Sequence, residues 1–277
     1  MSTLWRMSSH SFDPDKIEVR LTKNDAEIEA AQRLRYTVFY EEYGAKPDKE
    51  MKRQKRDMDA YDAITDHLVV IDKGCSKGLD TIVGTYRLLR QSVAEEHGEF
   101  YTSHEYDIQP LIDSGTTLLE LGRSCVLPDY RTRPVLQKMW QEIAHYVADH
   151  DIGMMFGCAS LHGTNIDELS EQLAYLYHYH LADPSVCPRA LDERFVDMNL
   201  HAKKDLDAKK AFMSLPPLIK GYIRLGASIG NGAVVDEQFN TTDICIVMPT
   251  AQITKKYLNH YERVTQKIMP TKQGKAV

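Results

Sequence analysis

The stretch TLLELGRSCVLPDYRTRPVLQKMWQEIAHYV, residues 117–147, decides the fold. Its first part, TLLELGRSCVLP at 117–128, predicts a β-strand, and the part after the loop predicts an amphipathic helix whose apolar residues share one arc. Thr132 is in position to cap this helix, and Pro134 falls in the first turn, where its missing N–H costs nothing. The stretch is therefore a strand, a tight loop and a helix.

The segments on both sides of this unit alternate between helix and strand. Asn24 is typical of a helix start, with Glu27 reaching back to complete a capping box, and the helix runs to about Tyr43. The other expected elements are strands at 67–72 and 81–90, a short strand near 153–160, a helix near 165–180, a hairpin at 232–248 with Asn240 at its turn, and a polar helix at about 251–267. This order predicts a mixed α/β sheet.

The length of 277 residues, with 43% apolar and 27% charged residues, is typical of a soluble globular protein. We expect a loose tail over residues 1–16, a folded domain over 17–250 with an inserted helical segment at about 200–226, and a C-terminal helix and tail over 251–277. Apolar runs such as ICIVM at 244–248 are far shorter than the ~20 residues that cross a bilayer. Because the N-terminus lacks the apolar segment of a signal peptide, a cytoplasmic location is expected.

The net charge of −6 argues against nucleic acid as a partner. Residues 46–56, KPDKEMKRQKR, depart from this total because they are rich in lysine and arginine. Such a run is either a solvated face or a docking surface for an acidic partner or an anionic membrane. Five cysteines without a CxxC pair indicate reduced thiols. No metal site is expected, since His178 and His180 are two apart on a predicted helix and do not face one site.

Arginine and glycine positions indicate a binding cleft. Arg35 falls within the apolar arc of the first helix, and a charge there is costly unless it meets a carboxylate or a ligand. Gly122 inside the predicted strand favours a β-bulge, which would bring Glu120 and Arg123 from opposite faces into one cleft. At the mouth of the following helix, Arg131 and Arg133 would reinforce free amides in a phosphate site, although any strand-to-helix unit has this general form.

Several long blocks carry a family resemblance: RLRYTVFYEEYGA at 33–45, DMDAYD at 57–62, VGTYRLLR at 83–90, ELGRSCVLPDYR at 120–131, FGCASLHGT at 156–164, LAYLYHYHLAD at 173–183, LPPLIKGYIRLGASIG at 215–230 and FNTTDICIVM at 239–248. Together they resemble the bacterial ornithine N-acyltransferases, which are relatives of the acyl-homoserine lactone synthases within the GNAT superfamily. The resemblance covers about residues 17–250. It implies a GNAT fold, with a mixed, mostly antiparallel sheet flanked by helices.

The resemblance also implies an activity, the transfer of a 3-hydroxyacyl group from acyl carrier protein to the α-amine of L-ornithine. This is the first step of ornithine lipid synthesis. No cofactor would be bound, because the donor brings 4'-phosphopantetheine on the carrier. The chain departs from the GNAT phosphate motif Q/R-x-x-G-x-G/A, since Pro134 and Leu136 occupy its glycine places. That departure suits a carrier-protein donor, and because such carriers are acidic the candidate docking residues are Lys52, Arg53, Lys55 and Arg56.

Single positions match the lactone synthases as well. The residues implied to bind the acceptor are Arg35, Phe39, Asp59, Asp62 and Arg87. The aspartates would take the δ-ammonium of ornithine, and Arg87 or Arg35 its carboxylate, although structural ion pairs use the same residue types. The tryptophan that the lactone synthases place shortly after the phenylalanine is replaced by Ala45.

The expected chemistry follows from residue types. Glu120, with Arg123 in the same strand, is the candidate base that deprotonates the amine, directly or through water. Backbone N–H groups at the bulge, near Cys125 or Val126, would hold the oxyanion. Tyr175 is the candidate acid for the leaving thiolate, although an aromatic stripe at that helix position is also typical of core packing. The residues expected to hold the acyl donor and its phosphopantetheine are Val126, Arg131, Thr132 and Arg133.

Three alternatives remain open from the sequence. One is an N-acyltransferase with another amino acid or amine as acceptor, and another is one with acyl coenzyme A as donor. The third is a non-enzymatic protein that binds lipid or carrier, which the segment 215–229 suggests, since it is either an amphipathic helix in peripheral contact with the membrane or a core helix.

Overall fold

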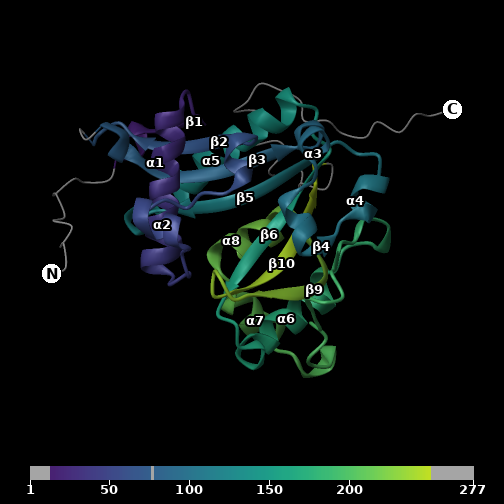
Figure 1. Cartoon of the computed structure of the whole chain (residues 1–277). Helices are drawn as coiled ribbons and strands as arrows, with labels where there is room; N and C mark the ends of the chain where they lie inside the picture. Colours follow the sequence, from purple (N-terminus) through teal and green to yellow (C-terminus); the bar gives the residue numbers. More distant parts are fainter. Residues whose placement is uncertain (1–12, 76–77, 251–277) are drawn as a thin grey trace.

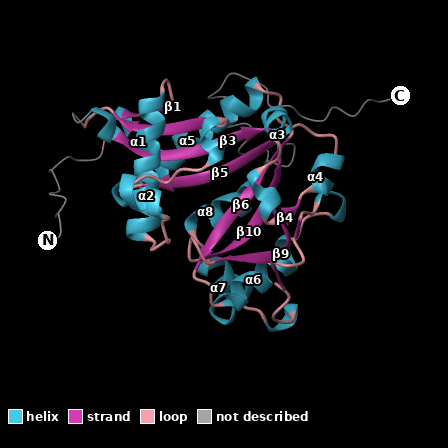
Figure 2. Ribbon diagram, in the orientation of Figure 1, coloured by secondary structure: helices cyan, strands magenta, loops and turns pink. Residues whose placement is uncertain are grey.

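One mixed sheet organises residues 13–75 and 78–250, the part of the chain that the computed structural model describes. Its ten strands are β1 (Ile17–Leu21), β2 (Asp66–Asp72), β3 (Ile82–Arg90), β4 (Tyr106–Asp107), β5 (Leu118–Val126), β6 (Met154–His162), β7 (Arg189–Ala190), β8 (Phe195–Val196), β9 (Ser228–Asp236) and β10 (Thr241–Pro249). They lie in the order β1-β2-β3-β5-β6-β10-β9-β7-β4, with β8 beside β9. Neighbouring strands are antiparallel except for β5 with β6 and β7 with β9 (Figure 2). The mixed sheet that the order of elements predicts is confirmed, and it is mostly antiparallel, as the family resemblance implies.

Helices cover both faces of the sheet (Figure 1). They are α1 (Asp25–Tyr36), α2 (Lys49–Gln54), α3 (Gln91–His97), α4 (Gln109–Asp113), α5 (Arg133–Asp149), α6 (Ile166–His180), α7 (Ala208–Ser214) and α8 (Pro217–Leu225). The alternation of side chains along β2 shows the two layers, because Leu68 and Val70 pack in the cluster of α5, α6 and α8, while Val69 between them packs against α1. Phe100 and Leu111 add a third cluster near α3 and α4.

The sheet opens between β5 and β6. The two strands pair in parallel from Leu118 opposite Met154 to Glu120 opposite Phe156, and beyond these positions they diverge (Figure 2). At the point of divergence the backbone of β6 lies so close to β5 that a Cβ on Gly157 would stand 2.2 Å from the carbonyl oxygen of Leu121. A glycine is therefore required there. The divergence creates the space in which the candidate site lies.

The predicted elements are confirmed within the described residues, with some ends shifted. Asn24 caps α1 by accepting a hydrogen bond from the N–H of Glu27 at 3.1 Å, and a π-helical turn, Thr37–Glu42, extends this helix as expected. Two details differ. The Glu27 carboxylate accepts from the N–H of Lys23 at 2.8 Å instead of from Asn24, and Thr132 precedes α5 without a side-chain capping bond. The helix expected at 251–267 lies outside the described residues, as does most of the expected tail at 1–16.

Segment 215–229, for which the sequence left two interpretations, contributes α8 to the core. Ile219, Tyr222 and Leu225 of this helix are buried in the cluster that α5 and α6 share. A membrane-facing role would have required this apolar face to be exposed. No helix among the described residues combines the length and the hydrophobicity needed to cross a bilayer. All five cysteines are free thiols.

Candidate active site

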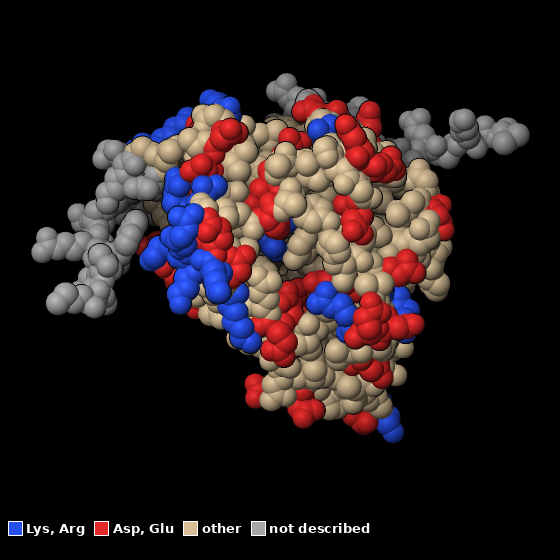
Figure 3. All heavy atoms as spheres, viewed as in Figure 1, with Lys and Arg blue, Asp and Glu red and all other residues tan. Residues whose placement is uncertain are grey.

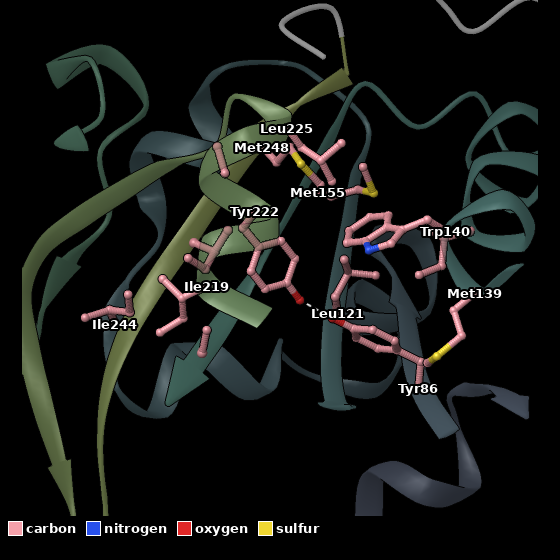
Figure 4. Packing of buried hydrophobic residues seen from close by; sticks show 14 of the residues in the cluster. Tyr86, Leu121, Met139, Trp140, Met155, Ile219, Tyr222, Leu225, Ile244 and Met248 are labelled. Atoms are coloured by element: carbon pink, nitrogen blue, oxygen red, sulfur yellow. Dashed lines mark hydrogen bonds between the residues drawn. The ribbon is translucent and has the colours of Figure 1, made fainter. Parts of the chain in front are cut away.

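A cavity of about 1180 Å³ occupies the opening between β5 and β6. Its walls come from these strands, from α5 and α8, and from the turn that joins β9 to β10. The wall toward α5 and α8 is apolar: Leu121, Met139, Trp140, Tyr222 and Leu225 line it and belong to the main hydrophobic cluster. Figure 4 shows these side chains, with the Tyr86 and Tyr222 hydroxyls hydrogen-bonded to each other across the cluster. The cavity thus joins an apolar region to the polar residues of β5.

The predicted bulge in β5 is confirmed. Thr85 of β3 stands opposite Cys125 and Arg87 opposite Gly122, so that one residue of β3 faces two of β5 between these pairs. The strained residue is Arg123, with φ +51°, and not the glycine. A left-handed backbone at an arginine is costly and is retained where the surroundings hold it. As the bulge predicts, Glu120 and Arg123 both line the cavity.

The Glu120 carboxyl group is buried, with 4% of the residue exposed. Its Oε2 accepts one hydrogen bond, from the N–H of Tyr101 at 2.9 Å, and its Oε1 accepts from the N–H of Thr102 at 2.6 Å and from the Thr102 hydroxyl. These amides begin the 3-10 turn Tyr101–His104. Burial raises the pKa of Glu120 above its ordinary value, although the bonds from Thr102 and Tyr101 lower it. Oε2 therefore keeps acceptor capacity, and the pKa of the carboxyl group lies above that of an ordinary glutamate.

The residues expected to hold the acyl donor meet at the end of β5 and the start of α5. The N–H of Leu127 donates to Val83 in β3 at 2.9 Å, so the alternation along the strand turns the preceding N–H, that of Val126, toward the cavity. The Oγ1 of Thr132 is buried and has no hydrogen-bond partner in the described part of the chain. Arg133, at the first position of α5, and Arg131 line the same cavity. An unpartnered hydroxyl, helix N-terminal amides and two cations suit a phosphate group.

Arg131 is partly engaged within the protein. It forms an ion pair with Glu42 at 2.6 Å and donates from Nε to the carbonyl of Val126 at 2.9 Å. Its guanidinium also lies over the ring of Tyr43, 5.3 Å from the ring centroid. These contacts hold the loop between β5 and α5 against the end of the first helix.

A buried network of three arginines and three aspartates lies beside the polar end of the cavity. Arg35 is fully buried, with Nε 2.7 Å from Asp57 and Nη2 2.8 Å from Asp62. Asp59 and Asp62 form a capping box on the 3-10 turn Ala60–Ala63, which explains why they are three residues apart. Burial opposes the ionisation of Asp62, but the charges of Arg35 and Arg87 outweigh it and hold the pKa of that carboxyl below its ordinary value. The prediction that Arg35 meets a carboxylate is confirmed.

The other two arginines connect the network to the cavity. Arg87 lies 2.6 Å from Asp59 and 3.3 Å from Asp62, and Arg123 lies 3.3 Å from Asp57 and 3.1 Å from Asp59. Both guanidinium groups stack on aromatic rings, and that of Arg123 lies 4.8 Å from the ring centroids of Tyr101 and Phe239. Each cation has carboxylate partners, so the network is balanced within the protein.

The structure does not bring every predicted site residue to the cavity. Phe39, Arg87, Glu120 and Arg123 line it, whereas the carboxylates of Asp59 and Asp62 and the guanidinium of Arg35 are paired behind its wall. Tyr175 lies on α6, away from the cavity, where its hydroxyl is 2.9 Å from His180 and its ring stacks on Tyr179. The expectation of an acid at Tyr175 therefore does not fit this arrangement, because the core packing that the sequence also allowed occupies the ring.

The predicted docking residues lie on and just after α2. Lys52, Arg53 and Lys55 are exposed, and Arg56 is half-buried against Gln32. Figure 3 shows lysines and arginines gathered over this side of the molecule. Arg53 pairs with Glu50 and Lys55 with Glu41, while within residues 13–75 and 78–250 neither Lys49 nor Lys52 forms an ion pair.

Sequence reasoning missed several residues of the site. Asp57 was overlooked beside the aspartates at 59 and 62, although the acidic block DMDAYD contains it. Tyr101 and Thr102, which hold Glu120, carry no sequence signal because their role depends on two backbone amides. Asp243, which also lines the cavity, lies in the block FNTTDICIVM, whose resemblance was noted without a role.

Comparisons with known proteins agree with this architecture. The acetyltransferase (GNAT) domain model matches residues 34–141. L-ornithine N(alpha)-acyltransferase of Rhizobium meliloti is 46% identical over 248 residues, covering 88% of this chain and 84% of the relative. The protein of the same name from Rhodobacter capsulatus is 45% identical over 251 residues, covering 90% and 96%. Among solved structures, FeeM, an N-acyl amino acid synthase from uncultured soil microbes, has a TM-score of 0.49 at 9% identity, covering 86% of this chain and 93% of that one.

Proposed function

This chain belongs to the family of L-ornithine N(alpha)-acyltransferases, and from that membership we propose that it transfers a 3-hydroxyacyl group from acyl carrier protein to the α-amine of L-ornithine. The product is lyso-ornithine lipid, made in the first step of ornithine lipid biosynthesis. The observation that carries the proposal is that the buried Glu120 carboxylate lines the same cavity as the start of α5 and the bulge of β5.

The proposed reaction is attack of the free α-amine on the thioester carbonyl. The N–C bond forms, the carbonyl oxygen becomes an oxyanion, and the nitrogen loses a proton to Oε2 of Glu120, directly or through water. The N–H of Val126 stabilises the oxyanion. The C–S bond then breaks, and the pantetheine sulfur leaves as a thiolate that takes up this proton. Arg123 does not transfer a proton, because its charge is held by Asp57 and Asp59; it positions the bulge beside Glu120.

The donor arm would run along the mouth of α5. A phosphopantetheine arm carries one phosphate and no nucleotide, and the unpartnered Thr132 hydroxyl with Arg131 and Arg133 offers one anion site. The acyl chain would extend between α5 and α8, where the wall is apolar. Acyl coenzyme A is the second donor that this cavity would accept. Tight binding of its pyrophosphate is not expected, because Pro134 occupies a glycine place of the GNAT phosphate motif.

The direct test of the function is a product assay. Purified protein is given 3-hydroxyacyl carrier protein with an equimolar mixture of amino acids, and the products are identified by mass spectrometry. A dominant N-acyl-ornithine is expected. Product from acyl coenzyme A but not from the carrier would overturn the donor assignment, and product from neither would favour a protein that binds lipid or carrier without catalysis.

Charge reversal on α2 tests the carrier as partner. We expect Lys52→Glu with Arg53→Glu to raise KM for acyl carrier protein roughly tenfold at low salt, with less effect at high salt, because exposed charges steer an acidic partner. KM for an acyl-pantetheine donor without the carrier should stay unchanged. The matched control is Lys204→Glu with Lys209→Glu, which makes the same change in charge at exposed positions near α7. Equal kinetics of the two double variants would exclude this docking surface.

A second prediction concerns the acyl chain. Gly221 of α8 lines the cavity, and apart from its two chain neighbours and the backbone of its own helix, no atom of the described residues lies within 4 Å of the position of a Cβ there. Gly221→Phe should fill the apolar region and shift the donor preference toward shorter chains by about tenfold in kcat/KM, since each displaced methylene forfeits about 0.8 kcal/mol. Gly221→Ala is the control for helix propensity and should keep the preference. An unchanged chain-length profile in the phenylalanine variant would show that the chain lies elsewhere.

A further inference from the structure

Three carboxyl groups meet at one wall of the cavity: those of Glu105, Asp236 and Asp243. One oxygen of each lies within 4.8 Å of the others. Asp236 ends β9 and Asp243 lies in β10, and both line the cavity, while Glu105 follows the 3-10 turn that holds Glu120. We define these three residues as the acidic triad.

The triad is short of positive charge. Asp243 is 7% exposed, and within the described residues its Oδ1 has no hydrogen-bond partner. Glu105 is 3% exposed, and its Oε2 accepts a hydrogen bond from the Cys158 thiol at 3.2 Å. Its nearest cation among the described residues is Arg194, at 3.8 Å. Asp236 Oδ1 accepts from the N–H groups of Gln238 and Phe239 at 2.8 and 2.9 Å. Two cations therefore act on three carboxyl groups: Arg194 is distant, and Arg123, whose charge lowers the pKa of Asp243, is already paired with Asp57 and Asp59.

The pKa values of Glu105 and Asp243 are raised, as expected for carboxyl groups with too little positive charge nearby. Burial, and then the charge of Asp243, raise the pKa of Glu105 to about 7, and burial together with the charge of Asp236 raises the pKa of Asp243 to about 6. Carboxyl groups that share a site with too few cations resist ionisation together. A cationic group that entered the triad would relieve both desolvation and repulsion.

The aspartates first expected to hold the δ-ammonium cannot serve in this way. Asp59 and Asp62 already face Arg87 at 2.6 and 3.3 Å, and Asp62 faces Arg35 at 2.8 Å. A substrate ammonium would have to displace an arginine from either of them, which would leave a buried cation without a partner. The acidic triad is the cluster at the cavity whose carboxylates exceed its cations.

The triad is also next to the candidate base. The Thr102 hydroxyl donates to Glu120, and the Cys158 thiol lies 3.8 Å from Thr102 and 3.2 Å from Glu105. An unbroken series of contacts therefore runs from Glu120 to the triad along one wall. The candidate base and the triad therefore share one wall, which is the arrangement that an acceptor with two amines joined by a short alkyl chain requires.

We propose that the acidic triad binds the side-chain ammonium of the amino-acid acceptor, so that Asp243 selects a dibasic amino acid and presents its α-amine to Glu120. This inference rests on the proposed function for the identity of the acceptor. It assigns specificity to the triad and leaves the acyl-transfer chemistry to β5.

The test compares ornithine with norvaline, which has the same carbon chain and no side-chain amine. Binding of each to the full-length protein and to Asp243→Asn is measured by calorimetry, and kcat/KM is measured with the same acyl donor. The variant should bind ornithine at least about thirtyfold more weakly, because one partner of a buried charge pair is lost, while norvaline binds as before. The matched control is Asp205→Asn, the same change at an exposed position, and it should keep the preference for ornithine.

Other results would overturn the inference. Loss of ornithine and norvaline binding to the same extent would mean that Asp243 is structural, and an unchanged preference would mean that the ammonium binds elsewhere. If Mg²⁺ or Ca²⁺ raises the Tm of the protein but not that of Asp243→Asn, and the preference persists, the triad is a metal site. A protein that binds ornithine through Asp243 but forms no acyl product would sink the proposed function and leave this inference standing.

Discussion

Replacing Glu120 by glutamine is expected to lower kcat by about 10²- to 10⁴-fold, the range over which a positioned acid or base contributes. The reason is that the amide has no proton affinity in the working pH range, while the cavity keeps its volume. The measurement is kcat at saturating donor and acceptor, together with circular dichroism and Tm to show that the variant is folded. A variant with more than a tenth of the original kcat would exclude Glu120 as the base.

Glu120 also holds a turn, so its catalytic and structural roles must be separated. Thr102→Val removes one hydrogen bond to the carboxylate and leaves the carboxylate in place, which makes it the matched control. It should keep most of kcat at high pH. If its kcat falls as far as that of Glu120→Gln, the role of Glu120 is to anchor the Tyr101–His104 turn.

The pH dependence gives an independent readout. A base works when deprotonated, so activity falls as the pH drops through its pKa, and burial puts this fall for Glu120 at a higher pH than for an ordinary glutamate. The hydroxyl of Thr102 lowers this pKa, so Thr102→Val should move the acidic limb of the kcat profile to higher pH. A limb that stays in place in this variant would mean that another group titrates there.

Residues close in the sequence were predictable, and those joined through tertiary contacts were not. The bulge followed from Gly122, because a strand glycine marks a break in pairing within a few residues. The left-handed backbone of Arg123 could not be predicted, because a propensity rule assigns it to the glycine. The same limit explains why the predicted role of Tyr175 as an acid does not fit the structure. The spacing of aromatic residues on α6 is compatible with core packing and with an active site, and only the packing of the other helices distinguishes them.

The charged residues show where this limit lies. Arg35 on an apolar arc predicts a carboxylate partner, since an unpaired buried charge is too costly, but it does not say which one. The partner Asp57 is 22 residues away in the chain. The family resemblance implies that the aspartates at 59 and 62 bind the substrate, with structural ion pairs as the alternative, and the structure shows that nearby arginines already neutralise them. The sequence predicts the chemical type of a charged residue's partner. Only the fold shows whether a given carboxylate is already neutralised by nearby cations.

The second large effect is on stability. Arg35→Leu should lower the free energy of unfolding by about 3–5 kcal/mol, because it leaves Asp57 and Asp62 buried without their partner. The measurement is urea unfolding at neutral pH. Arg33→Leu is the matched control on the same helix: its side chain is 44% exposed and lies 3.5 Å from Glu29, so the loss should be at most about 1 kcal/mol. Equal losses for the two variants would contradict the buried network.

The pH dependence of this stability separates a structural Arg35 from one that binds substrate. Because the pKa of Asp62 is lowered in the folded state, its pairing stabilises the protein above the ordinary pKa of 3.8 and is lost as the pH falls through the lowered value. The difference in the free energy of unfolding between the original protein and Arg35→Leu should therefore be largest at neutral pH and become smaller in acid. If Arg35 served mainly to bind the acceptor carboxylate, its replacement would change the free energy of unfolding little at any pH in the absence of ornithine, and it would raise KM for ornithine strongly. The ion pairs of Arg35 predict the opposite result. The free energy of unfolding of the free protein should fall strongly, and KM for ornithine should change little in the folded fraction of the variant.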